Sequence, residues 1–208
     1  MEDCKLYAFV DTAYLRGRAP EVVAQQLCDG GADLIQLRAK ASPLAEVRRM
    51  AEAVLPVTRK ANVGLVINDH WAVAHALGAE FCHLGQEDFF AAGFERVSQL
   101  TTPDHQLRIG LSTHQPAQAQ RALAAGANYI AIGPVFATDT KPTAKPVTPD
   151  YVRWAAANVT VPWFAIGGIN LQNLDDVLAA GARRICVVSA ILNADDVAKA
   201  CREFRKRL

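Results

Sequence analysis

The chain has 208 residues, of which 51% are hydrophobic and 21% charged, and its formal net charge is +1. This composition is typical of a globular protein with one core, so we expect residues 1–208 to form a single domain. A net charge so near zero excludes a general attraction for nucleic acid or an anionic membrane. An anionic partner is then a small molecule held by local basic groups.

No apolar run reaches the roughly 20 residues that a membrane-spanning helix requires. The start of the chain also lacks the basic and hydrophobic pattern of a secretory signal. The five cysteines are scattered and form no C-x-x-C pair, which argues against a disulfide framework and against a zinc site. We therefore expect a cytoplasmic protein with reduced thiols.

Short apolar runs typical of strands alternate with alanine-rich helical stretches along the whole chain, which predicts a parallel β/α architecture. In chain order, the predicted strands cover residues 6–11, 33–39, 64–69, 81–84, 108–112, 129–133, 163–167 and 184–188. The predicted helices include residues 20–29, 43–61, 115–125, 171–180 and 195–207.

Gly-Ala pairs recur just before predicted strands, where a glycine ends one helix and begins the next turn. The pairs are 31–32, 78–79, 126–127 and 181–182. Eight β/α units in 208 residues fall at the small end of the TIM-barrel range. An open doubly wound sheet of this length would have about five or six strands. We therefore predict a (β/α)8 TIM barrel, whose chemistry lies at the carboxyl ends of the strands.

The second predicted strand carries polar residues on one face only. Alternation sends Gln36, Arg38 and Lys40 to one side and apolar residues to the other. The apolar side suits the helix layer, so the polar side points into the barrel, where two cations need an anion or carboxylates as compensation. A bound pyrophosphate is the favoured explanation, and a solvated edge strand is the alternative.

Acidic residues follow the third and fourth predicted strands. Asp69 comes directly after Asn68, and Asp88 ends the run Gln-Glu-Asp that follows His83. One or two carboxylates, completed by water and phosphate oxygens, are the usual ligands of Mg²⁺ beside a diphosphate. Each aspartate alone could equally cap a helix, but together, facing Arg38 and Lys40, they favour a metal site.

Hydroxyl and basic groups gather after the fifth and sixth strands. Ser112 ends the fifth strand, and the segment after the sixth contains Thr138, Thr140 and Lys141. The Pro residue that follows Lys141 suggests a mobile loop that folds over a ligand, with a solvated loop as the alternative.

The last two strands end in a second group of phosphate-binding signals. Gly167 and Gly168 follow the seventh strand, and Val188 and Ser189 stand at the end of the eighth. Barrel phosphate sites are commonly built here from backbone N–H groups and a helix N-terminus. The barrel thus offers two separate phosphate sites.

In this order, six motifs spread over residues 6–192 resemble the thiamine phosphate synthase family. They are Gln36-x-Arg38-x-Lys40, Asn68-Asp69, His-Leu-Gly-Gln-Glu-Asp at 83–88, Gly-Pro-x-Phe-x-Thr-x-Thr-Lys at 133–141, Gly167-Gly168-Ile169 and Val188-Ser189.

The resemblance implies a transferase that joins a pyrimidine diphosphate to a thiazole phosphate, with Mg²⁺ held by Asp69 and Asp88. It implies that the pyrimidine diphosphate ionises first and that the thiazole nitrogen captures the resulting carbocation. The residues implied to bind the diphosphate are Arg38, Lys40, Asn68, Ser112 and Lys141. All of these except Asn68 are also implied to be catalytic. The implied aminopyrimidine contacts are Gln36 and His83. The implied thiazole phosphate contacts are Thr138, Thr140, Gly168, Val188 and Ser189.

Two departures and two alternatives accompany this resemblance. His70 stands where many relatives carry arginine or an aromatic residue, and the prolines of residues 142–149 put the closure of the sixth loop in doubt. A TenI-type thiazole tautomerase is one alternative, with His114 as its acid and base, and a non-catalytic sensor of phosphorylated ligands is another. Barrels of this size often self-associate, which leaves a homo-oligomer open.

Overall fold

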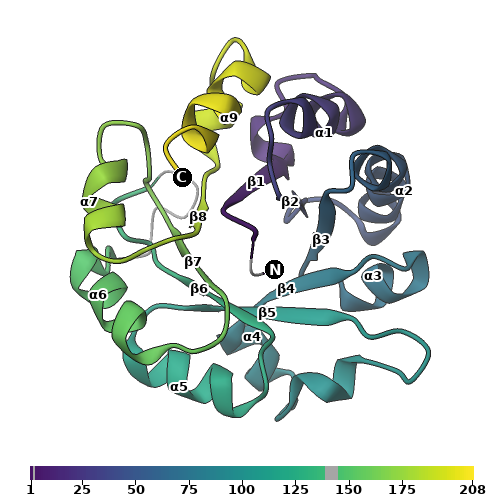
Figure 1. Cartoon of the computed structure of the whole chain (residues 1–208). Coiled ribbons are helices and arrows are strands. Elements are labelled where there is room, and N and C mark those ends of the chain that lie inside the picture. The colour runs from purple at the N-terminus through teal and green to yellow at the C-terminus, as the bar shows by residue number, and fades with distance from the viewer. Residues whose placement is uncertain (2, 139–144) are drawn as a thin grey trace.

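Eight parallel strands form a closed barrel in the order β1 to β8 (Figure 1), in a computed structural model that describes residues 1, 3–138 and 145–208. This confirms the predicted (β/α)8 barrel. The strands are β1 (Leu6–Asp11), β2 (Leu34–Arg38), β3 (Gly64–Asn68), β4 (Phe81–Gly85), β5 (Arg108–Thr113), β6 (Tyr129–Ile132), β7 (Trp163–Ile166) and β8 (Ile185–Cys186).

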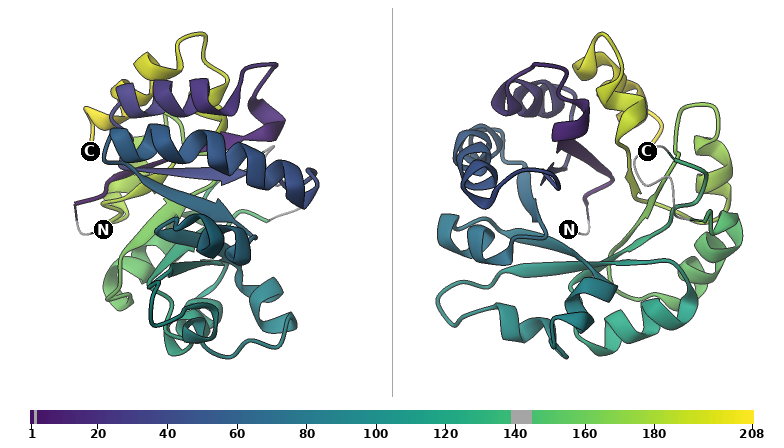
Figure 2. Two further views of the ribbon diagram at one scale, coloured as in Figure 1. Left: turned by 90° about the vertical axis from the view of Figure 1, so that its right-hand side faces the viewer. Right: turned by 180° about the vertical axis from the view of Figure 1, so that it is seen from behind.

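Helices surround the strands as an outer layer (Figure 2), and α1 packs against α9 where the ring closes. The α-helices are α1 (Pro20–Asp29), α2 (Leu44–Lys60), α3 (Trp71–Leu77), α4 (Gln86–Ala91), α5 (Pro116–Ala124), α6 (Thr148–Asn158), α7 (Leu174–Ala179), α8 (Ser189–Leu192) and α9 (Val197–Arg205). Two short 3₁₀ helices, η1 (Thr12–Tyr14) and η2 (Val97–Leu100), lie in the connections after β1 and α4.

Most predicted elements differ from the observed ones by a residue or two at their ends. The clearest difference is β8, which spans two residues rather than residues 184–188. The Val187 N–H still bonds to the Tyr7 carbonyl of β1, but the chain then turns at Val188 to begin α8. The start of α7 is also later than predicted, because residues 167–173 form a structured turn of their own.

The Gly-Ala pairs end helices as expected. Gly78 is the C-cap of α3 and has a left-handed φ of 64°, a conformation that costs glycine little. The glycines of the other three pairs also have positive φ angles, at positions 31, 126 and 181.

Aromatic side chains fill the interior of the barrel. The Tyr7 ring stacks on Phe9 with ring centroids 5.3 Å apart and meets the edges of Tyr129 and Phe164. Tyr7, Tyr129 and Phe164 are fully buried. This packed layer is a floor between the two ends of the barrel, so a cavity inside the barrel opens toward a mouth rather than running through it.

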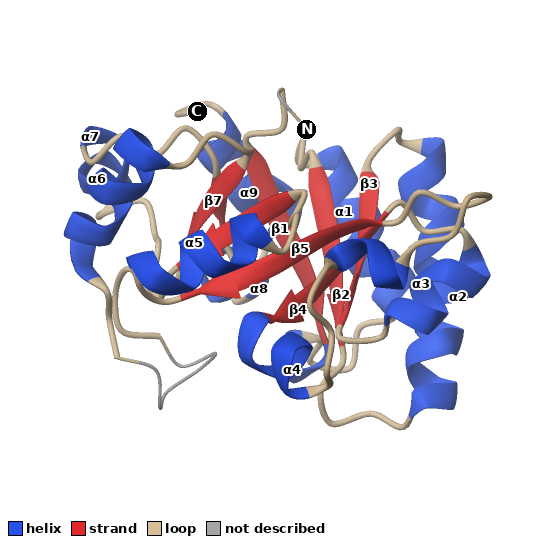
Figure 3. Cartoon of the chain, turned by 90° about the horizontal axis from the view of Figure 1, so that it is seen from below, coloured by secondary structure: helices blue, strands red, loops and turns tan. Residues whose placement is uncertain are grey.

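The two mouths carry different parts of the chain. Both termini lie at one end of the barrel, and α4 lies at the other, just after the carboxyl end of β4 (Figure 3). Because all eight strands are parallel, the loops that follow them gather at the end with α4. Among the described residues, no helix has both the length and the apolar character that spanning a membrane requires.

Gly110 of β5 lies directly against the Tyr129 ring. This close packing predicts that adding a methyl group at position 110 lowers the stability of the fold. A Cβ atom at position 110 would lie 2.1 Å from Tyr129 Cζ, and the ring has no exposed surface into which it could retreat. We expect Gly110→Ala to lower the free energy of unfolding by about 2 kcal/mol through overpacking, measured by urea denaturation.

Tyr129→Leu serves as the partner variant, because the smaller side chain leaves space for the new methyl group. The double variant should be clearly more stable than the sum of the two single changes predicts. Strict additivity would mean that the clash with Tyr129 is not the cause.

Candidate active site

A cavity opens at the carboxyl end of the strands, above the aromatic floor. Its empty volume is about 1210 Å³, including open solvent at the mouth. Every predicted site residue in the described part of the chain lines it, namely Gln36, Arg38, Lys40, Asn68, Asp69, His83, Asp88, Ser112, Thr138, Gly168, Val188 and Ser189. Thr140 and Lys141 lie outside the described residues.

Strand β2 presents its polar face to this cavity, where Arg38 is fixed by an ion pair. Arg38 Nη1 donates to Asp11 Oδ2 at 2.6 Å, and Asp11 is only 1% exposed. The other Asp11 oxygen accepts from the Ala13 N–H at 3.0 Å, so the carboxylate cannot turn freely. Deeper in the barrel, Gln36 Nε2 donates to the Tyr7 hydroxyl at 2.5 Å.

Asp69 stands at the end of β3 in a strained backbone conformation. Its φ of 64° is left-handed, a region that aspartate tolerates better than most residues and that often marks a functional position. Asn68 Nδ2 donates to Asp69 Oδ2 at 2.7 Å, and Lys40 Nζ lies 3.5 Å from the same oxygen. The carboxylate is therefore oriented toward Lys40, two residues beyond the end of β2.

The second carboxylate of the predicted pair comes from the first turn of α4. A Cβ atom at Gly85 would lie 2.6 Å from Asp88 Oδ2, which shows that the Asp88 carboxylate folds back over the end of β4. Glu87 also lines the cavity, but its Oε1 accepts from Gln118 Nε2 at 3.3 Å. From the sequence, Asp88 was expected in the segment after the fourth strand, and in the structure that segment is α4, which begins at Gln86.

His83 is buried between β3 and β5 and is held in its neutral form. Burial lowers the pKa of its imidazole to about 4, and the nearby charge of Lys40 adds to this shift. Its Nδ1 atom is buried with no hydrogen-bond partner among the described residues. A neutral ring at the cavity wall can offer one donor and one acceptor to a polar ligand.

The end of β5 contributes groups with different surroundings. Ser112 lines the cavity, whereas the Thr113 hydroxyl donates to the Ala131 carbonyl at 2.9 Å and lies 2.8 Å from the Tyr151 hydroxyl. The His114 Nδ1 atom contacts the Gly133 carbonyl of the loop after β6. Thr113 and His114 thus connect β5 to its neighbours.

The loops after β6 and β7 are joined by backbone hydrogen bonds. The Val135 N–H donates to the Ile166 carbonyl at 2.8 Å, and the Phe136 N–H donates to the Gly167 carbonyl at 3.0 Å. These bonds extend the pairing of β6 with β7 into the mouth, so the two loops form one wall of the cavity.

The two glycines after β7 allow this close approach. A Cβ atom would lie 2.3 Å from Pro134 if placed on Gly167, and 2.4 Å from the Ala137 carbonyl oxygen if placed on Gly168. Both glycines also have positive φ angles, 102° and 65°. Only glycine satisfies both conditions, so the chain turns here with its backbone exposed to the cavity.

Sequence reasoning did not find Asp11. It occupies the last position of β1, and it lies opposite Arg38 only because β1 and β2 pair in that register. The signal was present, since strand alternation puts Tyr7, Phe9 and Asp11 on one face. What was missing is the pairing that makes Asp11 the counter-charge of Arg38.

The donor set fits a loosely held hard cation better than a structural metal. In the described part of the chain, no three His, Cys, Asp or Glu side chains come together as a possible metal site. Asp69 and Asp88 supply two carboxylates at the mouth, and the third one there, Glu87, is engaged by Gln118. An ion that also takes water and phosphate oxygens, as Mg²⁺ does, suits such a pair.

Fold and site together define a (β/α)8-barrel enzyme whose pocket combines basic side chains, carboxylates and a glycine turn at the mouth, as expected for phosphorylated ligands that bind with a metal ion. The family model for thiamine monophosphate synthase matches residues 6–191. The chain belongs to this family, which makes it a transferase and bears out the resemblance drawn from the sequence.

Individual relatives agree. A thiamine-phosphate synthase of Halalkalibacterium halodurans is 38% identical over 98% of this chain and 95% of its own length. A thiamine-phosphate synthase of Thermus thermophilus is 44% identical over 86% of this chain and 84% of its own length. The solved thiamine phosphate pyrophosphorylase of Pyrococcus furiosus superposes with a TM-score of 0.81 at 30% identity, covering 98% of this chain and 94% of that one.

The low pKa of His83 predicts a pH dependence of stability. An unfolded histidine has a pKa of about 6.5, whereas the folded value is about 4. The unfolded state therefore binds the proton first on acidification, and stability is lost as the pH falls between these values. We expect His83 to account for roughly 2–3 kcal/mol of the loss between pH 7 and pH 4.5.

Urea unfolding of the wild type and of His83→Gln at both pH values, without added metal, measures this contribution. Subtracting the two pH-dependent losses removes the part due to carboxylates. The same loss in both proteins would contradict a buried neutral His83.

Proposed function

We propose that this enzyme joins a 4-aminopyrimidinylmethyl diphosphate to a thiazole phosphate, or to its carboxylated form, giving thiamine phosphate and pyrophosphate. The observation that carries the proposal is a cavity with two different ends. One has cations and carboxylates from β1 to β4, and the other has the glycine turn after β7 and the start of α8.

The cationic end suits the diphosphate. Arg38 ends β2 and Lys40 follows it two residues later, and Asn68 and Ser112 add neutral polar groups from β3 and β5. An incoming diphosphate competes with Asp69 for Lys40, which leaves the Asp69 carboxylate in need of another cation. Asp69 and Asp88 would then hold Mg²⁺, which when bound neutralises charge on the diphosphate.

The floor of the cavity suits the aminopyrimidine ring. Gln36 and neutral His83 lie above the aromatic layer, and each can exchange a hydrogen bond with a ring nitrogen or amino group. The thiazole phosphate would lie against Gly168, Val188, Ser189 and Thr138. The roles of Thr140 and Lys141 rest on the sequence alone, as do the cytoplasmic location and the single-domain boundary.

The reaction needs no covalent attachment to the protein. The bond between the pyrimidine methylene carbon and the diphosphate oxygen breaks, and its electron pair leaves with pyrophosphate. The thiazole nitrogen then supplies the pair for the new carbon–nitrogen bond. Catalysis comes from holding the two substrates in line and from stabilising the departing charge with Arg38 and Lys40.

The decisive test is turnover with both substrates and Mg²⁺, scored for thiamine phosphate and for pyrophosphate. A tautomerase would isomerise a thiazole carboxylate phosphate without the diphosphate, and a sensor would bind ligands without turnover. Either result would remove the proposed reaction.

Asp69→Asn tests the assignment of the carboxylates. The substitution keeps the size of the side chain but removes the charge that faces Lys40. We expect the chemical step in single-turnover experiments to slow by at least about a hundredfold, with much less change in thiazole phosphate binding.

Glu87→Gln is the matched control, because Glu87 lines the same cavity but is engaged by Gln118. It should retain a rate within about threefold of the wild type, because the glutamine Oε1 can still accept from Gln118 and only the charge on this weak hydrogen bond is lost. Equal rates for Asp69→Asn and the wild type would refute the role of Asp69.

A further inference from the structure

The turn after β7 has a support that stands behind the cavity wall. Gly168 and Ile169 line the cavity, whereas Asn173 is not one of the described residues lining it. Asn173 Nδ2 donates to the Gly168 carbonyl at 2.9 Å. The backbone of the turn is therefore held from the side away from the ligand space.

Asn173 is placed where its side chain would ordinarily serve a helix. It immediately precedes α7, and asparagine at that position commonly accepts a hydrogen bond from the first turn. Within the described residues its side chain makes no such bond to α7. Its Oδ1 instead accepts from the Asn170 N–H at 2.8 Å, so both polar ends of the side chain serve the turn.

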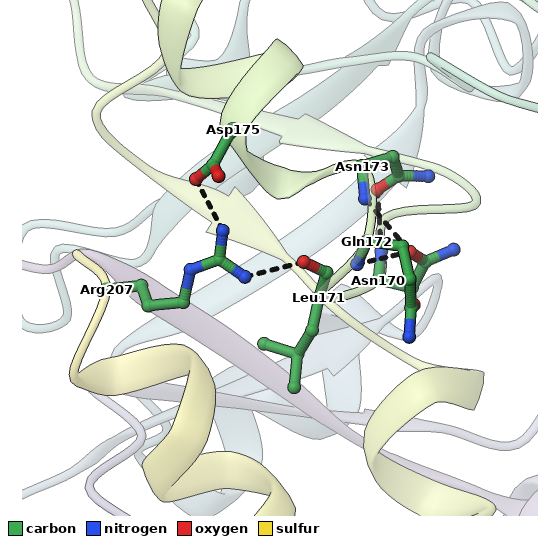
Figure 4. A network of polar contacts seen from close by, with 6 residues as sticks. All are labelled: Asn170, Leu171, Gln172, Asn173, Asp175 and Arg207. Atoms are coloured by element: carbon green, nitrogen blue, oxygen red, sulfur yellow. Dashed lines mark hydrogen bonds and ion pairs between the residues drawn. The ribbon is translucent and has the colours of Figure 1, made fainter.

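A network around the turn supports this arrangement (Figure 4). Asn170 Oδ1 accepts from the N–H groups of Gln172 and Asn173 at 2.9 and 3.1 Å. From the C-terminal segment, the Arg207 guanidinium donates to the Leu171 carbonyl and to Asp175, both at 2.5 Å. The asparagines hold the turn from within, and Arg207 contacts it from the solvent side.

Fixing the Gly168 carbonyl also fixes the next N–H group. In a trans peptide the C=O and N–H bonds point in opposite directions. With the Gly168 carbonyl bonded to Asn173, the Ile169 N–H points away from Asn173. Since Gly168 and Ile169 face the cavity and Asn173 does not, that direction is the cavity side.

We propose that Asn173 is a positioning residue for the thiazole phosphate: by clamping the Gly168 carbonyl it aims the Ile169 N–H at the phosphate. This rests on the proposed function, which assigns the thiazole phosphate to Gly168. The side chain touches no substrate and acts only through the peptide between Gly168 and Ile169.

Asn173→Asp separates the clamp from the rest of the turn. Aspartate keeps an oxygen for the Asn170 N–H and is well tolerated before a helix, so the melting temperature should change by no more than about 2 °C. The second carboxylate oxygen faces the Gly168 carbonyl and repels it. We expect the KM for thiazole phosphate to rise about tenfold, with the KM for the pyrimidine diphosphate within about twofold.

Three further variants distinguish the clamp from charge and from general loosening. Asn173→Ala removes the donor without adding charge and should raise the same KM. Asn170→Asp adds the same charge to the same turn while keeping the oxygen that accepts from Gln172 and Asn173. Arg207→Gln removes the outer contacts with Leu171 and Asp175. Arg207→Gln should stay within about threefold of the wild type, because its contacts do not reach Gly168. Asn170→Asp also removes a donor to the Gly168 carbonyl, but that contact is 3.5 Å long against 2.9 Å for Asn173, so it should raise the KM clearly less than Asn173→Asp does.

Two results would overturn the proposal: a wild-type KM for thiazole phosphate in Asn173→Ala, or equal increases in Asn173→Asp and Asn170→Asp. A wild-type enzyme that forms no thiamine phosphate would instead refute the reaction itself, so the two failures can be told apart.

Discussion

The ion pair between Arg38 and Asp11 is the interaction on which the site depends. A guanidinium that points into a barrel of aromatic side chains loses much of its hydration, and a nearly buried carboxylate compensates for that loss. Because the Ala13 N–H fixes the orientation of Asp11, the cation is already in position before any ligand arrives. Preorganised charge of this kind is the form of stabilisation that a departing diphosphate requires.

The same principle organises the rest of the cationic end. Lys40 faces Asp69, which Asn68 and a left-handed backbone hold in place. This second pair is more open than the first, with the lysine side chain 53% exposed, so it costs less to rearrange. The buried Arg38–Asp11 pair can keep its geometry while the more exposed Lys40–Asp69 pair separates to interact with a ligand.

The fold was predictable because its signals are local and repeated. Apolar runs, alanine-rich helices and Gly-Ala boundaries identify eight β/α units without reference to distant contacts. Side chains such as Arg38 and Asp69 were also predictable, since strand alternation and strand ends determine where they point. Asp11 was not, because its role depends on which strand lies beside β1. The short α4 was not among the helices named from the sequence, where Asp88 of its first turn was interpreted as a metal ligand, with a helix cap as the alternative.

The opposite wall of the cavity shows a deeper limit of sequence reasoning. Its polar groups include the backbone of residues 167–169 beside the Thr138 and Ser189 side chains, and any residue type carries the same backbone N–H group. The information that shapes this wall therefore lies in residues that permit or hold a backbone geometry. Gly167 and Gly168 permit it by letting the loop after β6 approach, and Asn173 holds it from behind. The shape of this backbone wall consequently depends on residues that lie behind the cavity surface as well as on those that line it.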